Sequence, residues 1–502
     1  MIAETTAFTI EGINAKPVRV RAEVIRGLPA FQIIGVPDAA AREVREIVRS
    51  AVTNSGFEFP LRRIEVTVTP ADNRKSGHGI HLAIAAAVLA AAGEIATDDL
   101  AGYGLVGDLA LDGTLRPVRG ALAMAEAAHQ MGKHGIIVPP SNGRESAFAL
   151  GIDVRTISEV SQLKTFGQMG NRGEPPVPFD FSTNGNLPDL KDLRGQGHLC
   201  DGLEVAAAGG HCLLMTGPPG SGKSLAARRL PSILPPLDGA EILEVARIGS
   251  VSGVGERLLS GNRPYRAPHH TVSATGLVGG GSPVRPGEVT LAHKGVLFLD
   301  ELPEFRREAL DALRHPVETG EVDITRGGRT FTLPADFQLI AASNPCGCGR
   351  GPWDIDCECS AASVNRYQTA LQGEITGNFD INIGVGIPSA DDIAAEPGRS
   401  SASVRDRVIA ARERMAHRYG SNKTNAMANP AEVAEFGLTP AAREAINRDH
   451  QFQAARNIHR LLKVARTLAD LAERSEIGED DIGSAAGHTN GKEQFVSETP
   501  FF

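Results

Sequence analysis

Hydrophobic and polar residues follow two different periods along the first third of the chain. Alternating or short unbroken apolar runs predict strands at 18–24, 64–69 and 135–138. Apolar residues at helical spacing predict helices at 40–50, 82–92 and 121–131. Because predicted strands and helices alternate, residues 1–166 are expected to form an α/β or α+β domain.

Three further apolar runs, at 212–215, 296–299 and 337–342, predict a second α/β unit over residues 192–388. Short runs of this kind are typical of buried parallel strands. Residues 389–502 show mainly helical spacing, and helices are expected at 403–417, 440–450 and 454–474. Thr439 and Pro440 supply a capping hydroxyl and a proline suited to the first helical position. The last dozen residues are expected to be frayed.

Residues 167–191 separate the two α/β regions and are rich in glycine, proline and asparagine. This composition predicts a linker, although a packed connector is the alternative. A chain of 502 residues has room for about three domains. The predicted fold is therefore an α/β multidomain protein, divided into 1–166, a linker at 167–191, 192–388 and 389–502.

Charge and composition narrow the class of protein. Lys and Arg number 51 and Asp and Glu 60, so the net charge is −9, and any nucleic-acid contact must come from a local patch or pore. The longest apolar run, 82–92, is too short to cross a bilayer, and the first residues show no secretory signal. Six cysteines do not form a disulfide framework. We therefore expect a cytoplasmic protein without a membrane partner.

A phosphate-binding loop follows the apolar run at 212–215. Its residues match the P-loop pattern without a mismatch: Gly217, Pro218, Pro219, Gly220, Ser221, Gly222, Lys223 and Ser224. Glycines let backbone N–H groups surround phosphates, and the following helix N-terminus favours negative charge. Lys223 is expected to reach the β- and γ-phosphates of ATP, and Ser224 to ligate Mg²⁺.

Two carboxylates and an amide follow the other two predicted strands. Asp300 and Glu301 end the run at 296–299, where parallel sheets bind their ligands. Asp300 is expected to hold the Mg²⁺ shell, and Glu301 to act as the general base on the attacking water. Asn344 follows the third run and would orient that water, although a turn asparagine before Pro345 is the simpler interpretation of Asn344 alone.

Several longer motifs resemble the magnesium-chelatase-like AAA+ proteins of the ComM/YifB type. They are PYRAPHH at 264–270, GGGS at 279–282, RPGE at 285–288, LAHKGVLFLDELPEF at 291–305, NPCGC at 344–348 and LLKVARTLAD at 461–470. The resemblance implies a Lon-protease-like (S5 domain 2-like) N-terminal domain, an AAA+ P-loop core and a C-terminal helical lid domain. It also implies an ATP-dependent homo-hexameric ring with DNA branch-migration or helicase activity, acting with recombination proteins in recombination or natural transformation.

The same resemblance assigns roles to single residues. Asn344 is similar to the sensor-1 asparagine, and Arg456 resembles the sensor-2 arginine that contacts the γ-phosphate from the lid. A solvated helix charge is the alternative interpretation of Arg456. The N-terminal region resembles Lon-type peptidases only in fold, because Gly77 and Leu122 stand where the serine and lysine are expected.

One departure from the family affects hydrolysis directly. Asn378 stands where the family has an arginine that is a candidate trans-acting finger. Asparagine cannot supply the cationic, bidentate contact that stabilises a phosphoryl group. Either Arg314, Arg326 or Arg366 replaces that arginine, or hydrolysis is weak.

Two remaining features concern metal and DNA. Cys346, Cys348, Cys357 and Cys359 lie within 14 residues and are either Zn²⁺ ligands or reduced cysteines, because the spacing within each pair is shorter than usual. The segment 257–294 is the candidate DNA-contacting surface, with an ordinary charged loop as the alternative. Its basic residues are Arg257, Arg263, Arg266, Arg285 and Lys294.

Three functions remain open from the sequence. The first is an AAA+ ATPase that translocates DNA. The second is the motor subunit of a metal chelatase, which remodels a protein partner. The third is a nucleotide-binding ring with weak hydrolysis that acts as a regulator.

Overall fold

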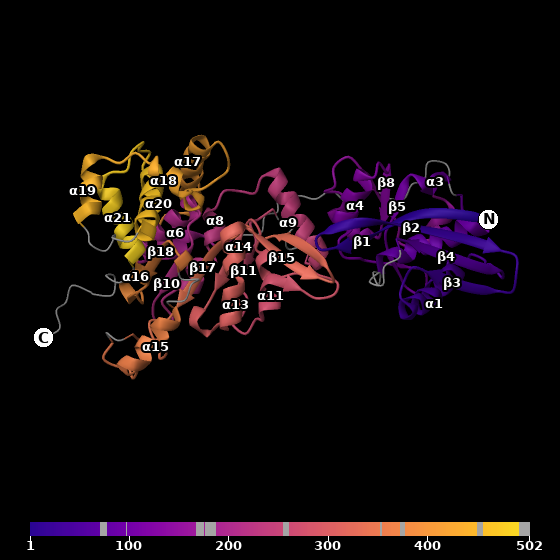
Figure 1. Ribbon diagram of the computed structural model, residues 1–502, viewed down its shortest axis with the longest axis horizontal. Coiled ribbons are helices and arrows are strands. Elements are labelled where there is room, and N and C mark those ends of the chain that lie inside the picture. The colour runs from indigo at the N-terminus through magenta and orange to yellow at the C-terminus, as the bar shows by residue number, and fades with distance from the viewer. Residues whose placement is uncertain are drawn as a thin grey trace.

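The chain forms an elongated molecule in which three regions follow one another (Figure 1). This computed structural model describes residues 1–70, 78–96, 98–166, 175, 187–254, 261–351, 354–371, 377–448 and 455–490. Most of the predicted linker at 167–191 and the whole predicted tail lie outside these residues, as do Gly77 and Arg257. Among the described helices, none is both long and apolar enough to cross a membrane.

The N-terminal region is a mixed seven-stranded sheet with the order β3-β4-β2-β1-β5-β8-β9. Its strands are β1 (Ile2–Glu11), β2 (Asn14–Ile25), β3 (Ala30–Ile34), β4 (Arg63–Thr69), β5 (Tyr103–Leu105), β8 (Gly135–Val138) and β9 (Asp153–Thr156), with a small β6 (Asp108–Leu109)–β7 (Leu115–Arg116) hairpin. Its helices are α1 (Asp38–Asn54), α2 (His81–Ala92), α3 (Asp98–Ala101), α4 (Ala121–Gln130) and α5 (Pro140–Ser146). All six elements predicted here from periodicity are present. Helix α2 is buried along almost its whole length, as its unbroken apolar sequence predicts.

The central region contains a parallel five-stranded sheet with the order β11-β14-β17-β10-β18. The strands are β10 (Leu213–Thr216), β11 (Tyr265–Arg266), β14 (Val296–Leu299), β17 (Gln338–Ser343) and β18 (Ile381–Gly384). Three of them were predicted to within a residue or so, whereas the short β11 and β18 were not. Because all five run in one direction, their carboxyl ends meet at one edge of the sheet.

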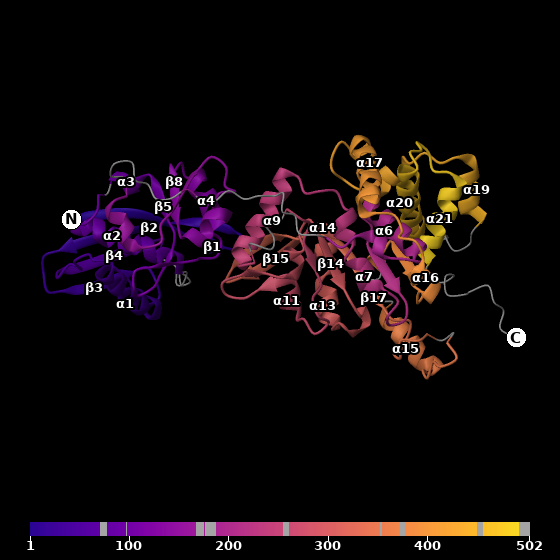
Figure 2. The same cartoon turned by 180° about the vertical axis from the view of Figure 1, so that it is seen from behind.

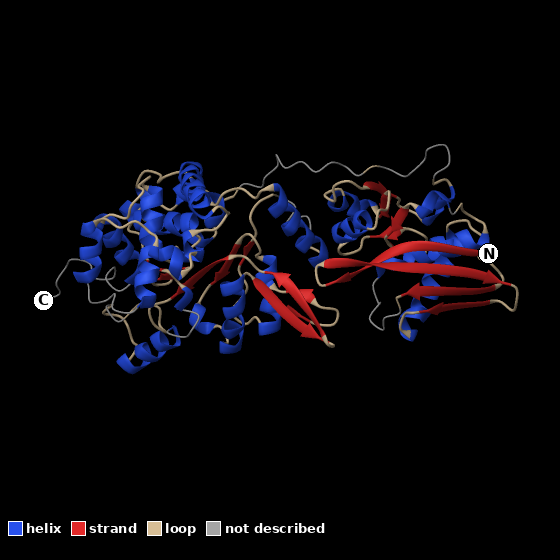
Figure 3. Cartoon of the chain, turned by 45° about the horizontal axis from the view of Figure 1, so that its top comes forward, coloured by secondary structure: helices blue, strands red, loops and turns tan. Residues whose placement is uncertain are grey.

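Helices cover both faces of this sheet. Val296 and Phe298 pack into one hydrophobic core, and Leu297 and Leu299 into the other, as alternation along a strand requires. The helices of this region are α6 (Gly197–Gly209), α7 (Lys223–Ala227), α8 (Leu230–Ile233), α9 (Gly239–Ser252), α11 (Ala274–Val278), α12 (Glu288–Leu291), α13 (Arg307–Ala312), α14 (Arg314–Thr319) and α15 (Ala361–Leu371). Two hairpins belong to this region, β12 (Gly279–Gly280)–β13 (Arg285–Pro286) and β15 (Glu321–Arg326)–β16 (Arg329–Pro334). The longer one contacts the β1–β2 turn, where Arg329 donates to Glu11 at 2.7 Å. Figure 3 shows the strands of the whole chain in red.

The third region is helical, as predicted. It contains α16 (Ala390–Ala394), α17 (Ser401–Tyr419), α18 (Pro430–Ala434), α19 (Pro440–Arg448), α20 (Ala455–Leu471) and α21 (Glu479–Asn490). The buried His211, which precedes β10, lies 2.9 Å from Asp380 Oδ2 and 2.9 Å from Thr467 Oγ1 on α20. These contacts fix α20 near the amino ends of β10 and β18.

Helix α9 joins the central region to the N-terminal sheet by packing on α4. Arg247 donates two hydrogen bonds to Glu126, at 2.7 and 2.9 Å, and the Gly120 N–H donates to Ser250 O at 2.9 Å. Leu122 is fully buried beside this contact.

Candidate functional site

The loop from Gly217 to Gly222 connects β10 to α7 at the carboxyl edge of the central sheet (Figure 2). The Gly217 N–H donates to Ser343 O at 3.1 Å, so the loop is attached to the end of β17. A Cβ atom at Gly217 would lie 2.1 Å from Val385 O, so only glycine fits there. Gln196 holds the other side of the loop by donating to Ser221 O at 2.7 Å. The sequence-predicted loop therefore has the strand–loop–helix setting that phosphate binding requires.

The Lys223 side chain lies inside this loop with 8% of its surface exposed. Its Nζ donates to Gly217 O at 2.7 Å and to Pro218 O at 2.9 Å. Burial lowers the pKa of Lys223, although the nearby charges of Asp300 and Glu301 act in the opposite direction. A bound phosphate would add negative charge beside the ammonium group and favour its charged form.

Ser224 and Asp300 meet across the sheet edge. The Ser224 hydroxyl donates to Asp300 Oδ2 at 2.6 Å, although the two residues are 76 positions apart. A hydroxyl and a carboxylate oxygen are ligands of the type that Mg²⁺ takes in nucleotide sites. This donor pair fits the predicted Mg²⁺ site, and the ion would bind beside the phosphate loop.

Glu301 has an unusual backbone conformation. Its φ is +54°, in the left-handed region that non-glycine residues seldom adopt. Its N–H donates to Asp300 Oδ1 at 3.0 Å, and its side chain is 52% exposed. The turn therefore separates two adjacent carboxylates, so that Asp300 points at Ser224 while Glu301 remains accessible to water.

His270 is a site residue that the sequence analysis missed. Its Nδ1 lies 3.2 Å from Glu301 Oε2. It follows β11, the neighbour of β14 in the sheet, so the two strand ends bring His270 and Glu301 together. The available sequence signal was a polar residue just after a strand-like pair, but the short β11 was itself not predicted.

Replacing His270 by alanine is expected to lower the turnover number for ATP about tenfold and to leave ATP affinity nearly unchanged. A hydrogen bond to a charged carboxylate is worth about 1.5–3 kcal/mol, and partial exposure reduces it. Steady-state hydrolysis and nucleotide titration measure the two effects. His315→Ala is the matched control, because His315 is an exposed histidine on α14. His270→Asn should recover part of the rate. If His270→Ala, His270→Asn and the control variant all hydrolyse ATP at the same rate, His270 does not contribute to hydrolysis.

Asn344 lies at the end of β17, between the ends of β10 and β14. Its Oδ1 is 3.5 Å from Lys223 Nζ. The structure thus brings Asn344 to the phosphate loop together with Lys223, Ser224 and Asp300. This position is compatible with the predicted role in orienting water.

Arg456 does not join this group. It donates to Gly377 O at 2.9 Å, and Arg460 donates to the same oxygen at 2.7 Å. Gly377 comes just before β18, whose first residue Ile381 pairs with Leu213 at the start of β10. Arg456 therefore lies at the amino edge of the sheet, whereas the phosphate loop leaves the carboxyl edge. The expectation that Arg456 contacts a γ-phosphate bound to the same chain does not fit this arrangement.

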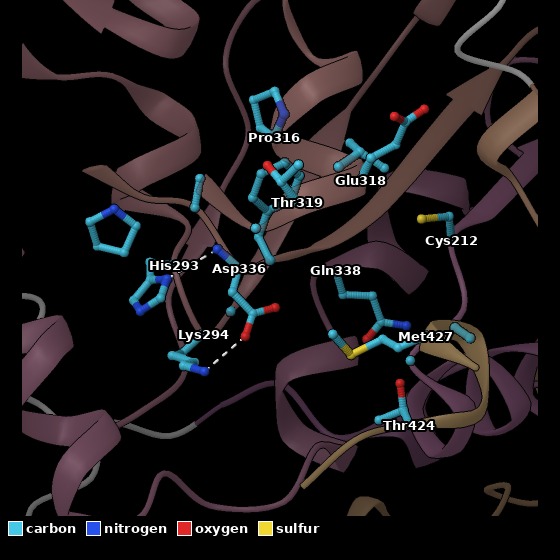
Figure 4. A pocket seen from close by; sticks show the side chains of 18 of the residues that line it. Cys212, His293, Lys294, Pro316, Glu318, Thr319, Asp336, Gln338, Thr424 and Met427 are labelled. Atoms are coloured by element: carbon cyan, nitrogen blue, oxygen red, sulfur yellow. Dashed lines mark hydrogen bonds and ion pairs between the residues drawn. The ribbon is translucent and has the colours of Figure 1, made fainter. Parts of the chain in front are cut away.

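A cavity of about 1290 Å³ opens at the same amino edge. Cys212 and Gln338, which stand at the starts of β10 and β17, line it (Figure 4), as do Asn378 and Arg456. Asn378 thus lies at the amino edge of the sheet, whereas Lys223 lies at the carboxyl edge. The three candidate replacements for its missing arginine are all exposed: Arg314, Arg326 and Arg366.

The four clustered cysteines follow Asn344 directly. All four Sγ atoms lie within 4.8 Å of one another. Cys346 is buried and Cys348 exposed, with Cys357 and Cys359 between these extremes. The predicted grouping of these thiols is therefore present in the fold.

The predicted DNA-contacting segment needs a correction. Arg266 donates twice to Glu288, at 2.7 and 2.8 Å. Arg263 pairs with Glu241 at 3.0 Å, and Lys294 pairs with Asp336 at 2.8 Å. These three cations are occupied by internal carboxylates that the sequence order did not reveal. Arg285, on β13, is exposed.

Comparison with known proteins gives a consistent family assignment. Models described as magnesium chelatase, subunit ChlI; subunit ChlI of Mg-chelatase; and magnesium chelatase, subunit ChlI C-terminal match residues 189–393, 20–142 and 398–488. YifB of Escherichia coli is 39% identical over 484 residues, which cover 95% of each chain. Competence protein ComM of Haemophilus influenzae is 36% identical over 494 residues, again 95% of each chain. The magnesium-chelatase 67 kDa subunit of Chlorobaculum parvum matches at 32% over 126 residues, 25% of this chain and 18% of that subunit.

Proposed function

The chain belongs to the magnesium-chelatase-like AAA+ family of ComM and YifB, and on this basis we propose that it is an ATP-hydrolysing ring motor that acts on DNA. The observation that carries the proposal is the meeting of Lys223, Ser224, Asp300 and Glu301 at one edge of the central sheet. We assign the N-terminal sheet to a Lon-protease-like domain without peptidase activity, and the C-terminal helices to a lid. A cytoplasmic location belongs to the same proposal.

The hydrolysis step follows from the positions of these side chains. The loop N–H groups and Lys223 bind the ATP phosphates, and Lys223 offsets the charge on the β- and γ-phosphates. Ser224 and Asp300 would hold Mg²⁺, which supplies neutralising charge to the phosphates. Glu301 accepts the proton from the attacking water, His270 positions that carboxylate, and Asn344 orients the water.

The position of Arg456 favours an oligomer. An arginine at the amino edge of the sheet can reach a phosphate only if another subunit presents its carboxyl edge to it. A closed homo-hexamer with head-to-tail contacts repeats such an arrangement around the ring. In this proposal, Arg456 acts on the nucleotide of the neighbouring subunit. An exposed Arg314, Arg326 or Arg366 replaces the finger missing at Asn378.

The proposed DNA contacts are local, because the chain is acidic overall. Arg285 on β13 and Arg326 at the turn of the β15–β16 hairpin are exposed cations. The competence role in the name of the ComM relative supports a DNA substrate. We propose single-stranded or branched DNA within a ring, with branch migration or helicase activity in recombination or natural transformation, together with recombination proteins.

A nucleotide-binding ring with weak hydrolysis that acts as a regulator is the second candidate, because Asn378 occupies the position of the finger. A chelatase motor that remodels a protein partner is less well supported. The chelatase-subunit match to Chlorobaculum parvum covers only 25% of this chain, whereas the ComM match covers 95%.

DNA binding is expected to be nucleotide-dependent and strongly salt-sensitive. A ring that contacts 6–10 phosphates loses about 10³–10⁵ in affinity between 50 and 200 mM salt. Fluorescence anisotropy with labelled single-stranded and forked DNA, with and without a non-hydrolysable ATP analogue, measures this. Arg285→Ala should weaken binding to every sequence alike, and Arg307→Ala, which removes an exposed arginine on α13, serves as control. If the nucleotide-loaded protein binds neither the single-stranded nor the forked DNA at low salt, the DNA proposal is wrong.

A further inference from the structure

The cysteine cluster has the dimensions of a metal site. The Sγ atoms of Cys346 and Cys348 are 3.3 Å apart, and that of Cys357 lies 3.8 Å from Cys346 and 3.6 Å from Cys348. A tetrahedral zinc ion with Zn–S bonds of about 2.3 Å separates its sulfur ligands by about 3.8 Å. All four sulfurs approach one another to within 4.8 Å, so one ion could contact each of them.

The surrounding loop supports the sulfurs in the way that thiolate sites require. The Gly351 N–H donates to Cys346 Sγ at 3.3 Å, which favours a negatively charged sulfur. Arg350 pairs with Asp356 at 2.8 Å and ties together the two halves of the loop that carry the two cysteine pairs. The chain turns directly after the first cysteine pair, at Gly349, whose φ is +86°.

This loop also touches the nucleotide site. A Cβ atom at Gly349 would lie 2.8 Å from Pro219 Cδ and Cγ in the phosphate loop, so the two loops are in close contact. Cys346 is only two residues beyond Asn344, at the end of β17. On α15, which follows the cysteines, Tyr367 contacts Ser343 and the backbone of Asn344. The cysteine loop is therefore held between the phosphate loop and the polar end of β17.

We propose that Cys346, Cys348, Cys357 and Cys359 bind one Zn²⁺ in a closed, all-thiolate tetrahedral site. The site is structural, because four protein ligands leave no position for water. It holds the chain after Asn344 against Pro219 and so helps to set the shape of the ATP-binding loop.

Zinc content tests the site without requiring activity, ATP or DNA. Full-length protein purified without chelators is expected to contain about one zinc per chain by inductively coupled plasma mass spectrometry. The double variant Cys348→Ser/Cys359→Ser should lose it. Cys200→Ala is the matched control, because Cys200 is a buried residue of α6 in the hydrophobic core and should leave the zinc content unchanged.

Cobalt provides a second measurement if the double variant does not fold. Wild-type protein titrated with Co²⁺ should develop the intense visible bands of tetrahedral thiolate coordination, and Zn²⁺ should remove them. Zinc-free wild-type protein with four reactive thiols in this loop and no cobalt bands would overturn the proposal. An intact mass that shows a disulfide between these cysteines would overturn it as well.

The positioning role has a separate readout. Zinc-loaded wild-type protein and Cys200→Ala should bind a fluorescent ATP analogue equally well, and the double variant should bind it more weakly. Equal affinity in all three proteins would overturn the link to the phosphate loop.

Discussion

The Lys223→Ala variant is expected to lose ATP affinity by about a hundredfold. Lys223 is the buried cation of the phosphate loop, and a hydrogen bond to a charged partner contributes about 1.5–3 kcal/mol. Alanine removes the charge and leaves the carbonyl oxygens of Gly217 and Pro218 without this donor. Titration with a fluorescent ATP analogue measures the loss.

Two comparisons make this result specific. Lys16→Ala removes the same charge from the exposed edge of β2 in the N-terminal sheet and should bind ATP normally. Thermal unfolding of Lys223→Ala separates loss of binding from loss of fold. If folded Lys223→Ala binds ATP as well as the wild type, the assignment of the phosphate loop is wrong.

Replacing Glu301 by glutamine is expected to stop turnover while ATP remains bound. Loss of a general base lowers a rate by about 10²–10⁴. Glutamine has nearly the same shape and tolerates the same turn, and the Ser224–Asp300 contact does not involve it. Single-turnover hydrolysis and nucleotide titration on the same preparation give the rate and the affinity.

Glu304→Gln is the control for this change. Glu304 ends the short helical turn that begins after Glu301 and is exposed. It should hydrolyse ATP at the wild-type rate. If Glu301→Gln hydrolyses ATP at the wild-type rate, Glu301 is not the general base. The proposed role of His270 in positioning that carboxylate would then be wrong as well.

The sequence predicted the parts of this site that depend on local order. Each of β10, β14 and β17 is a short apolar run followed directly by its functional residues. The same short stretch of sequence therefore predicts both the strand and the polar residues at its end. Parallel pairing then places Lys223, Asp300 and Asn344 at one edge without further information. The clustered cysteines were found for the same reason, because their separation along the chain is short.

The remaining features depend on contacts between distant segments. His270 meets Glu301 only because the two-residue β11 pairs with β14, and so short a strand leaves almost no periodic signal. Arg456 was placed wrongly relative to the nucleotide, since nothing local indicates that α20 docks near the amino edge through His211 and Thr467. Arg263, Arg266 and Lys294 form a basic stretch in sequence, but carboxylates 22 to 42 positions away bind them.

In the proposed function, ATP hydrolysis at this edge of the sheet drives a ring on DNA. Steady-state hydrolysis with and without single-stranded and forked DNA, together with a mass measurement in solution with bound nucleotide, tests it most directly. We expect a hexamer whose hydrolysis rises when DNA is added and disappears in Glu301→Gln. A protein that binds ATP but hydrolyses it negligibly under every condition would contradict the motor and support the regulatory ring.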